Sequence, residues 1–363
     1  MRFRALPLVG VAAVAVTVLA GCANPGGAAG DDSGSGISIV ATTTQMADLT
    51  RQVAGDAAQV TQLLQPNTSA HSFDPAPVNL LELAEADALV MNGAGLESWL
   101  GDAVLASGFD GVTIDASRGI ELHGSDHDHA PEDAHADESA TEHAEHADET
   151  AEEPDAADEH TADDGHDHAE EPTGDPHIWT STRNAIVIVD DIADQLEELD
   201  PANADSYAAN AAAYTARLEA LDGWATAQID RVPAAERLLV TNHESVTYLA
   251  EDYGITYVGA VLPSFDDNAE LAASDIADLA AKIRATGATA VYSEASLSPK
   301  SAEAIAREAG VQLFTGEDAL YVDSLGPAGS PASTYLDAQL HNISQILLGW
   351  GVTPDPVPAS VTE

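Results

Sequence analysis

The sequence predicts an α/β protein made of two similar lobes with parallel sheets, joined by a long rigid helical segment, with a ligand site in the cleft between them. Short apolar runs alternate with helical patterns over residues 37–114, and the same alternation returns over residues 238–350. Such alternation is typical of parallel α/β units. Between these two regions the chain is Ala-rich and helical in pattern over residues 181–229. Clefts between lobes are where ligands usually bind.

The first lobe is predicted from four apolar runs that read as strands, separated by helical stretches. A Gly follows the first helix at Gly55 and a Pro begins the second at Pro77, both usual helix boundary signals. The expected strands are 37–42, 60–64, 88–91 and 112–114, and the expected helices are 44–54, 77–86 and 96–106.

The connection is predicted as two long helices, 181–199 and 202–229, with a break at Asp200-Pro201 because Pro cannot continue a helix. The second lobe then repeats the alternation. Its expected strands are 238–241, 256–260, 290–293 and 312–314, and its expected helices are 245–252, 269–285, 300–309 and 335–350, with a Gly/Pro/Ser loop over 320–330.

The N-terminus has the pattern of an export signal. Arg2 and Arg4 precede an apolar run over residues 6–19, which is short for a membrane span but suits a signal peptide. The run ends in Leu-Ala-Gly-Cys, which resembles the signal of bacterial lipoproteins, so lipidation at Cys22 and anchoring outside the cell membrane are expected. Cys22 is the only Cys, which excludes an intramolecular disulfide and a thiolate metal cluster.

The charge of the chain limits its partners. Its 363 residues include 12 Lys and Arg against 62 Asp and Glu, a formal net charge of −50. Phosphate binding needs basic patches, so nucleic acid is excluded as a partner. An acidic surface suits a cation ligand, although it can also serve solubility alone.

An acidic, His-rich low-complexity segment, residues 123–168, interrupts the first lobe. Residues 121–175 contain 22 acidic residues and no Lys or Arg, with too few large apolar side chains to bury a core. Imidazole and carboxylate together are ligands for borderline divalent metals, so the segment points to metal handling. Nine of the 13 histidines are the expected accessory ligands: His123, His127, His129, His135, His143, His146, His160, His166 and His168.

Three of the other four histidines lie in predicted loops. His71 follows the second strand, His177 begins the ordered stretch after the acidic segment, and His243 follows the first strand of the second lobe, at the sheet edge where ligand sites collect. Asp323 lies in a loop after the last strand. Three imidazoles and one carboxylate would form a closed tetrahedral site, which favours Zn²⁺ over Mn²⁺. A single loop histidine is more often a surface residue, and His341, in the last helix, is expected to pack without binding metal.

Four motifs carry a resemblance to a known family: His71 with Ser-Phe-Asp-Pro, Asp-Pro-His177-Ile-Trp, Asn-His243-Glu, and Asp323-Ser-Leu-Gly. The chain resembles the metal-binding solute lipoproteins of bacterial ATP-binding-cassette importers, in their zinc and manganese branch. The resemblance covers nearly all of the mature chain. It implies two α/β lobes bridged by a long helix, with the metal held between them by His71 and His177 of the first lobe and His243 and Asp323 of the second.

The resemblance also favours zinc. An acidic His-rich loop before the second ligand is typical of zinc members, and manganese members tend to have a carboxylate at the position of His243. Two departures matter: a disulfide of some zinc members cannot form here, and Ala70 stands where some members have Glu. Glu294, at the end of a predicted strand, is the candidate that orients a ligating histidine from behind; the alternative is an exposed strand-end acid.

These observations divide the chain into a signal peptide (1–21), a tether (22–36), a first lobe (37–180) with a disordered acidic loop (120–174), linking helices (181–235) and a second lobe (236–363). The predicted function is a monomeric zinc carrier outside the cell, without enzymatic activity, that delivers Zn²⁺ to a membrane permease. Imidazole protonation is expected to compete with zinc near pH 5.

Two other functions stay open at this level. A metal-buffering adhesin-type lipoprotein would use the acidic segment as its main site. A zinc hydrolase is less favoured: His243-Glu244 begins like the His-Glu-x-x-His signature, but Thr247 replaces the second His.

Overall fold

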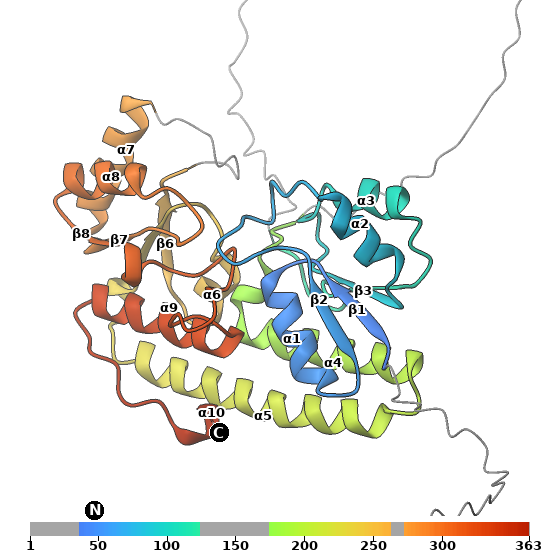
Figure 1. Ribbon diagram of the computed structural model, residues 1–363. Coiled ribbons are helices and arrows are strands. Elements are labelled where there is room, and N and C mark those ends of the chain that lie inside the picture. Colours follow the sequence, from blue (N-terminus) through green and yellow to red (C-terminus); the bar gives the residue numbers. More distant parts are fainter. Residues whose placement is uncertain (1–35, 124–173, 263–271, 363) are drawn as a thin grey trace, which may run out of the picture. The chain divides into compact units, whose positions relative to one another are not determined.

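The computed structural model describes residues 36–123, 174–262 and 272–362 (Figure 1). In its first lobe, four parallel strands form one sheet in the order β2-β1-β3-β4, with β1 paired to both β2 and β3. The elements are β1 (Ser38–Ala41), α1 (Thr44–Ala54), β2 (Gln59–Gln62), α2 (Pro77–Ala84), β3 (Ala88–Met91), α3 (Leu100–Ser107) and β4 (Val112–Asp115).

Helix α1 shows how local sequence sets its boundaries. The Thr43 hydroxyl accepts a hydrogen bond from the Met46 N–H and caps the first turn. Gly55 ends the helix with a φ of 54°, a conformation that favours glycine. The expected bounds of this helix are therefore confirmed, and its N-terminus lies just beyond the carboxyl end of β1.

The connection between the lobes consists of α4 (Thr182–Leu199) and α5 (Ala204–Ile229), which pack along each other. The break between them is confirmed. Helix α5 contacts α1 and α4, and it also contacts α9 and α10 of the second lobe (Figure 1). One apolar core runs from the first sheet through both helices into α9, which makes the bridge stiff.

The second lobe has two pairs of parallel strands, β5 with β6 and β7 with β8. A parallel bridge between Glu294 and Leu320 continues the line of β7. The elements are β5 (Leu238–Thr241), α6 (Thr247–Asp252), β6 (Thr256–Ala260), α7 (Ala273–Thr286), β7 (Ala290–Tyr292), α8 (Lys300–Ala309), β8 (Gln312–Phe314), α9 (Tyr335–Gly349) and α10 (Ala359–Thr362).

The predicted helix at 96–106 begins later than expected, at Leu100. Gly93, Ala94 and Gly95 all have positive φ, and the buried Glu97 side chain accepts hydrogen bonds from the Asn92 and Gly93 N–H groups. These bonds hold residues 92–99 in turns and irregular backbone, whereas apolar spacing predicted that the helix begins at residue 96. Likewise, α6 begins at Thr247 rather than Ser245.

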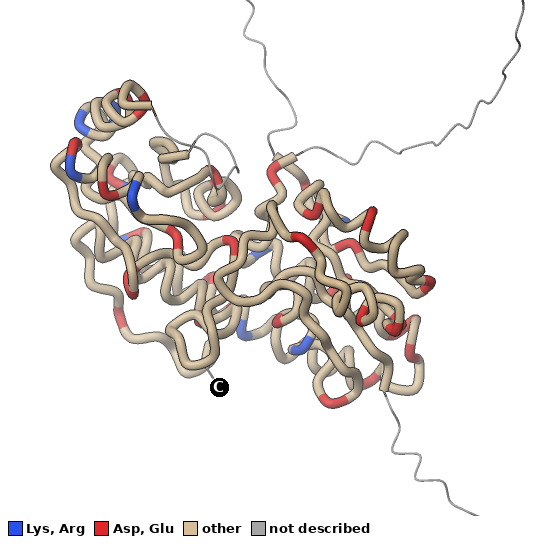
Figure 2. Tube along the Cα trace, turned by 45° about the horizontal axis from the view of Figure 1, so that its top comes forward, with Lys and Arg blue, Asp and Glu red and all other residues tan. Residues whose placement is uncertain are grey.

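Several predictions concern residues outside the described ranges: the signal peptide, lipidation at Cys22, most of the tether, and the acidic loop beyond His123. The lobe boundaries also stay predictions. Within the described ranges, no helix combines the length and apolar character needed to cross a membrane. Figure 2 shows acidic residues spread over both lobes, with few Lys or Arg among them.

Candidate metal centre

Four side chains from distant parts of the sequence converge on one point. His71, His177, His243 and Asp323 each offer one ligand atom, and these four atoms all lie within 4.8 Å of one another. His177, His243 and Asp323 are buried, and His71 is partly exposed. The structure thus brings together the four residues expected from the sequence.

The spacing of these atoms suits a small tetrahedral ion. The Nε2 atom of His177 lies 3.2 Å from Nε2 of His71 and 3.4 Å from Nε2 of His243. Asp323 Oδ1 lies 3.2 Å from His243 Nε2 and 3.9 Å from His177 Nε2. Zinc bonds of about 2.0–2.1 Å place the ligand atoms of a tetrahedron roughly 3.3 Å apart.

Loops and turns of both lobes bring these residues together. His243 lies two residues beyond β5, and His71 lies between β2 and α2. His177 immediately precedes a 3-10 turn, Ile178–Thr180, and Asp323 follows the Glu294–Leu320 bridge. Ligand sites collect at the carboxyl ends of parallel strands, and here loops of both lobes bring together residues that are 66 to 106 positions apart, such as His177 with His243 and with His71.

Carboxylates behind two of the histidines fix their rings. His177 Nδ1 lies 2.6 Å from Asp175 Oδ1, and His243 Nδ1 lies 2.7 Å from Glu294 Oε1. A protonated Nδ1 that donates to a carboxylate leaves Nε2 as the atom for metal coordination. Both backbone N–H groups donate to the same oxygens, so each carboxylate holds both ring and main chain.

His71 and His243 differ in protonation, because their pKa values are shifted in opposite directions. Burial, with a contribution from His177, lowers the pKa of His71 to about 4. Burial also disfavours a charged His243, but the carboxylates of Glu294 and Asp323 outweigh it and hold the pKa of His243 well above its usual value. At pH 5 the His71 ring is therefore largely neutral, whereas the proton on His243 competes with a metal at that pH and above.

Asp323 is an anion in a buried place. Burial acts to raise its pKa, but the nearby histidines, His243 foremost, lower it to about 2. Its Oδ1 atom is buried and lies 3.2 Å from His243 Nε2. In the metal-free centre the protonated His243 ring faces this carboxylate, and a cation among the three Nε2 atoms would take the place of that proton.

Sequence reasoning missed the role of Asp175, although an acid two residues before a histidine is a readable signal. The sequence also did not predict the hydrogen bonds that hold the Pro176 carbonyl. Asn92 Nδ2 donates to the Pro176 carbonyl at 2.9 Å, and the Glu97 carboxylate accepts from Asn92 N and from the Thr42 hydroxyl. Nothing in the sequence pattern around Asn92 indicates this link to the segment of His177.

The remaining histidines within the described residues lie outside the group of four. His341 Nε2 lies 2.9 Å from the Ala319 carbonyl oxygen, and its ring contacts Tyr321, in agreement with a packing role. His123, where the acidic segment begins, lies 3.1 Å from a Glu251 carboxylate oxygen on α6 and packs on the Tyr248 ring. The other eight predicted accessory histidines lie outside the described ranges.

A known family matches most of this chain. The family described as zinc-uptake complex component A, periplasmic, matches residues 39–348 of this chain. Among curated proteins, the zinc-binding protein AdcA of Streptococcus pyogenes is 30% identical over 280 residues, which cover 76% of this chain and 49% of that protein. This chain thus spans about half the length of AdcA.

Other relatives differ in the metal that they are named for. The manganese-binding lipoprotein MntA of Halalkalibacterium halodurans is 26% identical, with 93% of this chain and 95% of that protein covered. The iron-binding protein YfeA of Yersinia pestis is 27% identical, with 88% of each covered.

Solved structures share the fold. The periplasmic zinc-binding protein TroA of Treponema pallidum gives a TM-score of 0.67 at 22% identity, with 87% of this chain and 99% of that chain covered. A manganese-bound periplasmic metal-binding protein of Candidatus Liberibacter asiaticus gives 0.67 at 22% identity, with 86% and 99% covered. This likeness supports the two-lobe α/β architecture described above.

Proposed function

This chain belongs to the zinc-uptake complex component A family, and from that premise we propose that it captures Zn²⁺ outside the cytoplasm and hands it to an ATP-binding-cassette permease. The observation that carries the proposal is the meeting of His71, His177, His243 and Asp323 within 4.8 Å. The relatives support a metal-binding role, but their names divide among zinc, manganese and iron.

The ligand chemistry favours zinc over manganese. Three imidazole nitrogens and one carboxylate oxygen match the borderline-soft, four-coordinate preference of Zn²⁺. Manganese prefers more oxygen ligands and a higher coordination number. The two carboxylates behind the rings, Asp175 and Glu294, make the imidazoles stronger donors without adding oxygen ligands of their own.

The cellular setting is proposed from the sequence. Lipidation at Cys22 would anchor the chain to the outer face of the membrane, beside its permease, and the Gly/Ser-rich stretch up to residue 36 would serve as a tether. The acidic His-rich segment would collect zinc weakly at several points and raise its concentration near the centre. Low-complexity ligands lose chain entropy at each binding event, so the tight site is assigned to the lobes.

The enzyme alternative has little support. In zinc proteases the His-Glu-x-x-His signature lies on a helix, whereas His243 and Glu244 precede α6, which begins at Thr247. His243 is buried while Glu244 is exposed. Neither the family description nor the names of the relatives denotes an enzyme. A metal-buffering lipoprotein is the remaining alternative, and it requires many weak sites instead of one tight site.

Zinc titration of a shortened protein tests the proposal. Because Asp175 N donates to the His123 carbonyl at 2.7 Å, the two ends of the acidic segment adjoin, and a short Gly-Ser linker can replace residues 124–173. We expect one tight zinc site to persist. In this background His177→Ala should weaken it by at least roughly 100-fold, whereas His341→Ala, the matched control, should not.

The outcomes separate the candidates. Loss of all tight binding in the shortened protein would favour the metal buffer and reject the lobe site. A parallel titration with Mn²⁺ addresses selectivity, and tighter binding of manganese than of zinc would reject the zinc assignment.

A further inference from the structure

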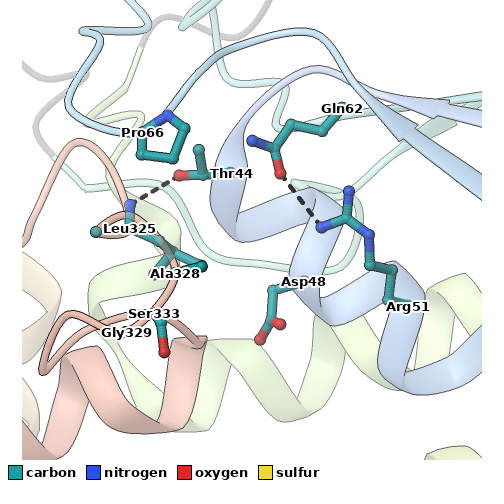
Figure 3. Close-up of a pocket in the computed structure, with 10 residues that line it drawn as sticks. Thr44, Asp48, Arg51, Gln62, Pro66, Leu325, Ala328, Gly329 and Ser333 are labelled. Carbon is teal, nitrogen blue, oxygen red and sulfur yellow. Dashed lines mark hydrogen bonds between the residues drawn. The ribbon is translucent and has the colours of Figure 1, made fainter.

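The segment that carries Asp323 is held by the opposite lobe. Gln45 Nε2, at the start of α1, donates to the Val322 carbonyl at 2.7 Å. The Leu325 N–H donates to the Thr44 hydroxyl at 2.8 Å, as Figure 3 shows. Two neighbouring residues of α1 therefore bind the main chain immediately before Asp323 and two residues after it.

These contacts form one continuous chain of hydrogen bonds. The Thr44 hydroxyl accepts from Leu325 and donates to Gln45 Oε1 at 2.9 Å, which orients the Gln45 amide so that its nitrogen donates to Val322. A third contact from the first lobe supports the middle of the segment, where the Asn67 N–H donates to the Ser324 hydroxyl at 2.8 Å.

Burial makes this arrangement costly to break. Thr44 is 2% exposed and Gln45 is 1% exposed, and Val322 and Leu325 are also buried. Separation of α1 from the segment would leave the Gln45 amide and the Leu325 N–H without these partners, whereas the Val322 carbonyl would keep a second donor, Trp179 Nε1, at 2.8 Å. The cap of α1 does not depend on these residues, because the Thr43 side chain provides it.

We propose that Thr44 and Gln45 are positioning residues that clamp Asp323 onto the bound metal, so that the ion leaves only when this clamp opens. The inference rests on the proposed function, since it takes Asp323 as a ligand of the carried ion. It extends that function, because residues of the first lobe then fix the position of Asp323, the fourth proposed ligand. The clamp thereby couples the contact between the lobes to the lifetime of the bound zinc.

The test measures chelator-driven zinc release from the full mature chain by stopped flow. Thr44→Val removes the hydroxyl at nearly constant volume, and Gln45→Met removes the amide. Each should speed zinc dissociation roughly tenfold, the effect of one buried hydrogen bond, with little change in association. Thr44→Ser keeps the hydroxyl and should release zinc at the wild-type rate.

Thr50→Val is the matched control. Thr50 is also buried on α1, but its hydroxyl donates to the Met46 carbonyl within the helix and does not reach the Asp323 segment. It should leave zinc release unchanged. If Thr50→Val accelerates release as much as Thr44→Val, loss of α1 stability explains the effect and the clamp is rejected.

A double mutant shows whether the clamp acts through Asp323. In an Asp323→Ala background, Gln45→Met should no longer accelerate zinc release; a tenfold effect that persists there overturns the proposal. Should Thr44→Val fail to fold by circular dichroism, Gln45→Met carries the test. If the wild-type protein has no tight zinc site, the proposed function itself is rejected. If the wild-type protein binds zinc tightly and Gln45→Met releases zinc at the wild-type rate, only the clamp is rejected.

Discussion

His243 and Glu294 form a buried pair in which the ring Nδ1 lies 2.7 Å from Oε1, and the same oxygen accepts the His243 backbone N–H. Glu294 is 1% exposed and His243 is 2% exposed. One carboxylate therefore fixes both the ring orientation and the main chain of a proposed zinc ligand. The expectation that Glu294 supports a histidine agrees with this geometry, and its effect on metal binding is open to measurement.

Replacement of Glu294 by Gln should weaken zinc binding about 10- to 100-fold, because the neutral amide makes the imidazole a poorer donor. Isothermal titration with a competing chelator, at several pH values, measures the loss. Glu303→Gln, an exposed acid on α8, is the control and should bind zinc normally. Wild-type affinity in Glu294→Gln would mean that this carboxylate does not tune His243.

Asp175 should have the same effect at the second ring. In Asp175→Asn the contact of 2.6 Å with His177 Nδ1 loses its charge, and we expect zinc affinity to fall by about 10- to 100-fold. Asp74→Asn is a matched control, since Asp74 is an exposed acid in the motif of His71. An equal loss of zinc affinity in the two variants would show that net charge near the centre, and not the bond to His177, determines binding.

Zinc binding should release a proton from His243 at neutral pH. The pKa of this residue is raised well above its usual value, so the metal-free ring is protonated and zinc must displace that proton. Apparent affinity should therefore rise with pH, about tenfold per unit below the pKa of His243. His71, with a pKa of about 4, is already neutral and adds nothing.

Calorimetry in buffers of different ionisation enthalpy counts these protons. In Glu294→Gln, where one of the two carboxylates that hold the proton is neutral, fewer protons should be released at the same pH. Zinc uptake without proton release by the wild-type protein at neutral pH would contradict a charged His243.

Much of the architecture could be predicted from the sequence, because its signals are local. Helix α1 begins after a capping Thr and ends at Gly55, and the run Ala88–Met91 is apolar throughout, so both elements have the expected bounds. The four proposed ligands could also be predicted from the sequence. His71, His243 and Asp323 stand in loops that follow predicted strands, where ligand sites collect, and His177 begins the ordered stretch after the acidic segment.

The remaining features depend on contacts that no local pattern encodes. The turn that delays α3 to Leu100 is held by the buried Glu97 side chain. The grip of Thr44 and Gln45 on the Asp323 segment joins residues more than 270 positions apart. In sequence these are ordinary polar residues at a helix start, and only tertiary packing places them against the other lobe.

Two glycines in long helices should respond to alanine in opposite directions. A Cβ at Gly349 of α9 would lie 1.9 Å from the Tyr292 hydroxyl oxygen, which donates to the Ile346 carbonyl and is fixed in the core. Gly349→Ala should therefore lower the free energy of unfolding by about 1–3 kcal/mol through overpacking. At Gly223 of α5 no atom beyond the adjoining backbone of its own helix lies within 4 Å of the added Cβ, so Gly223→Ala should raise the free energy of unfolding by about 0.5–1 kcal/mol through helix propensity. Urea unfolding of the metal-free protein measures both, and destabilisation by Gly223→Ala would contradict the regular, open environment of this position on the bridging helix.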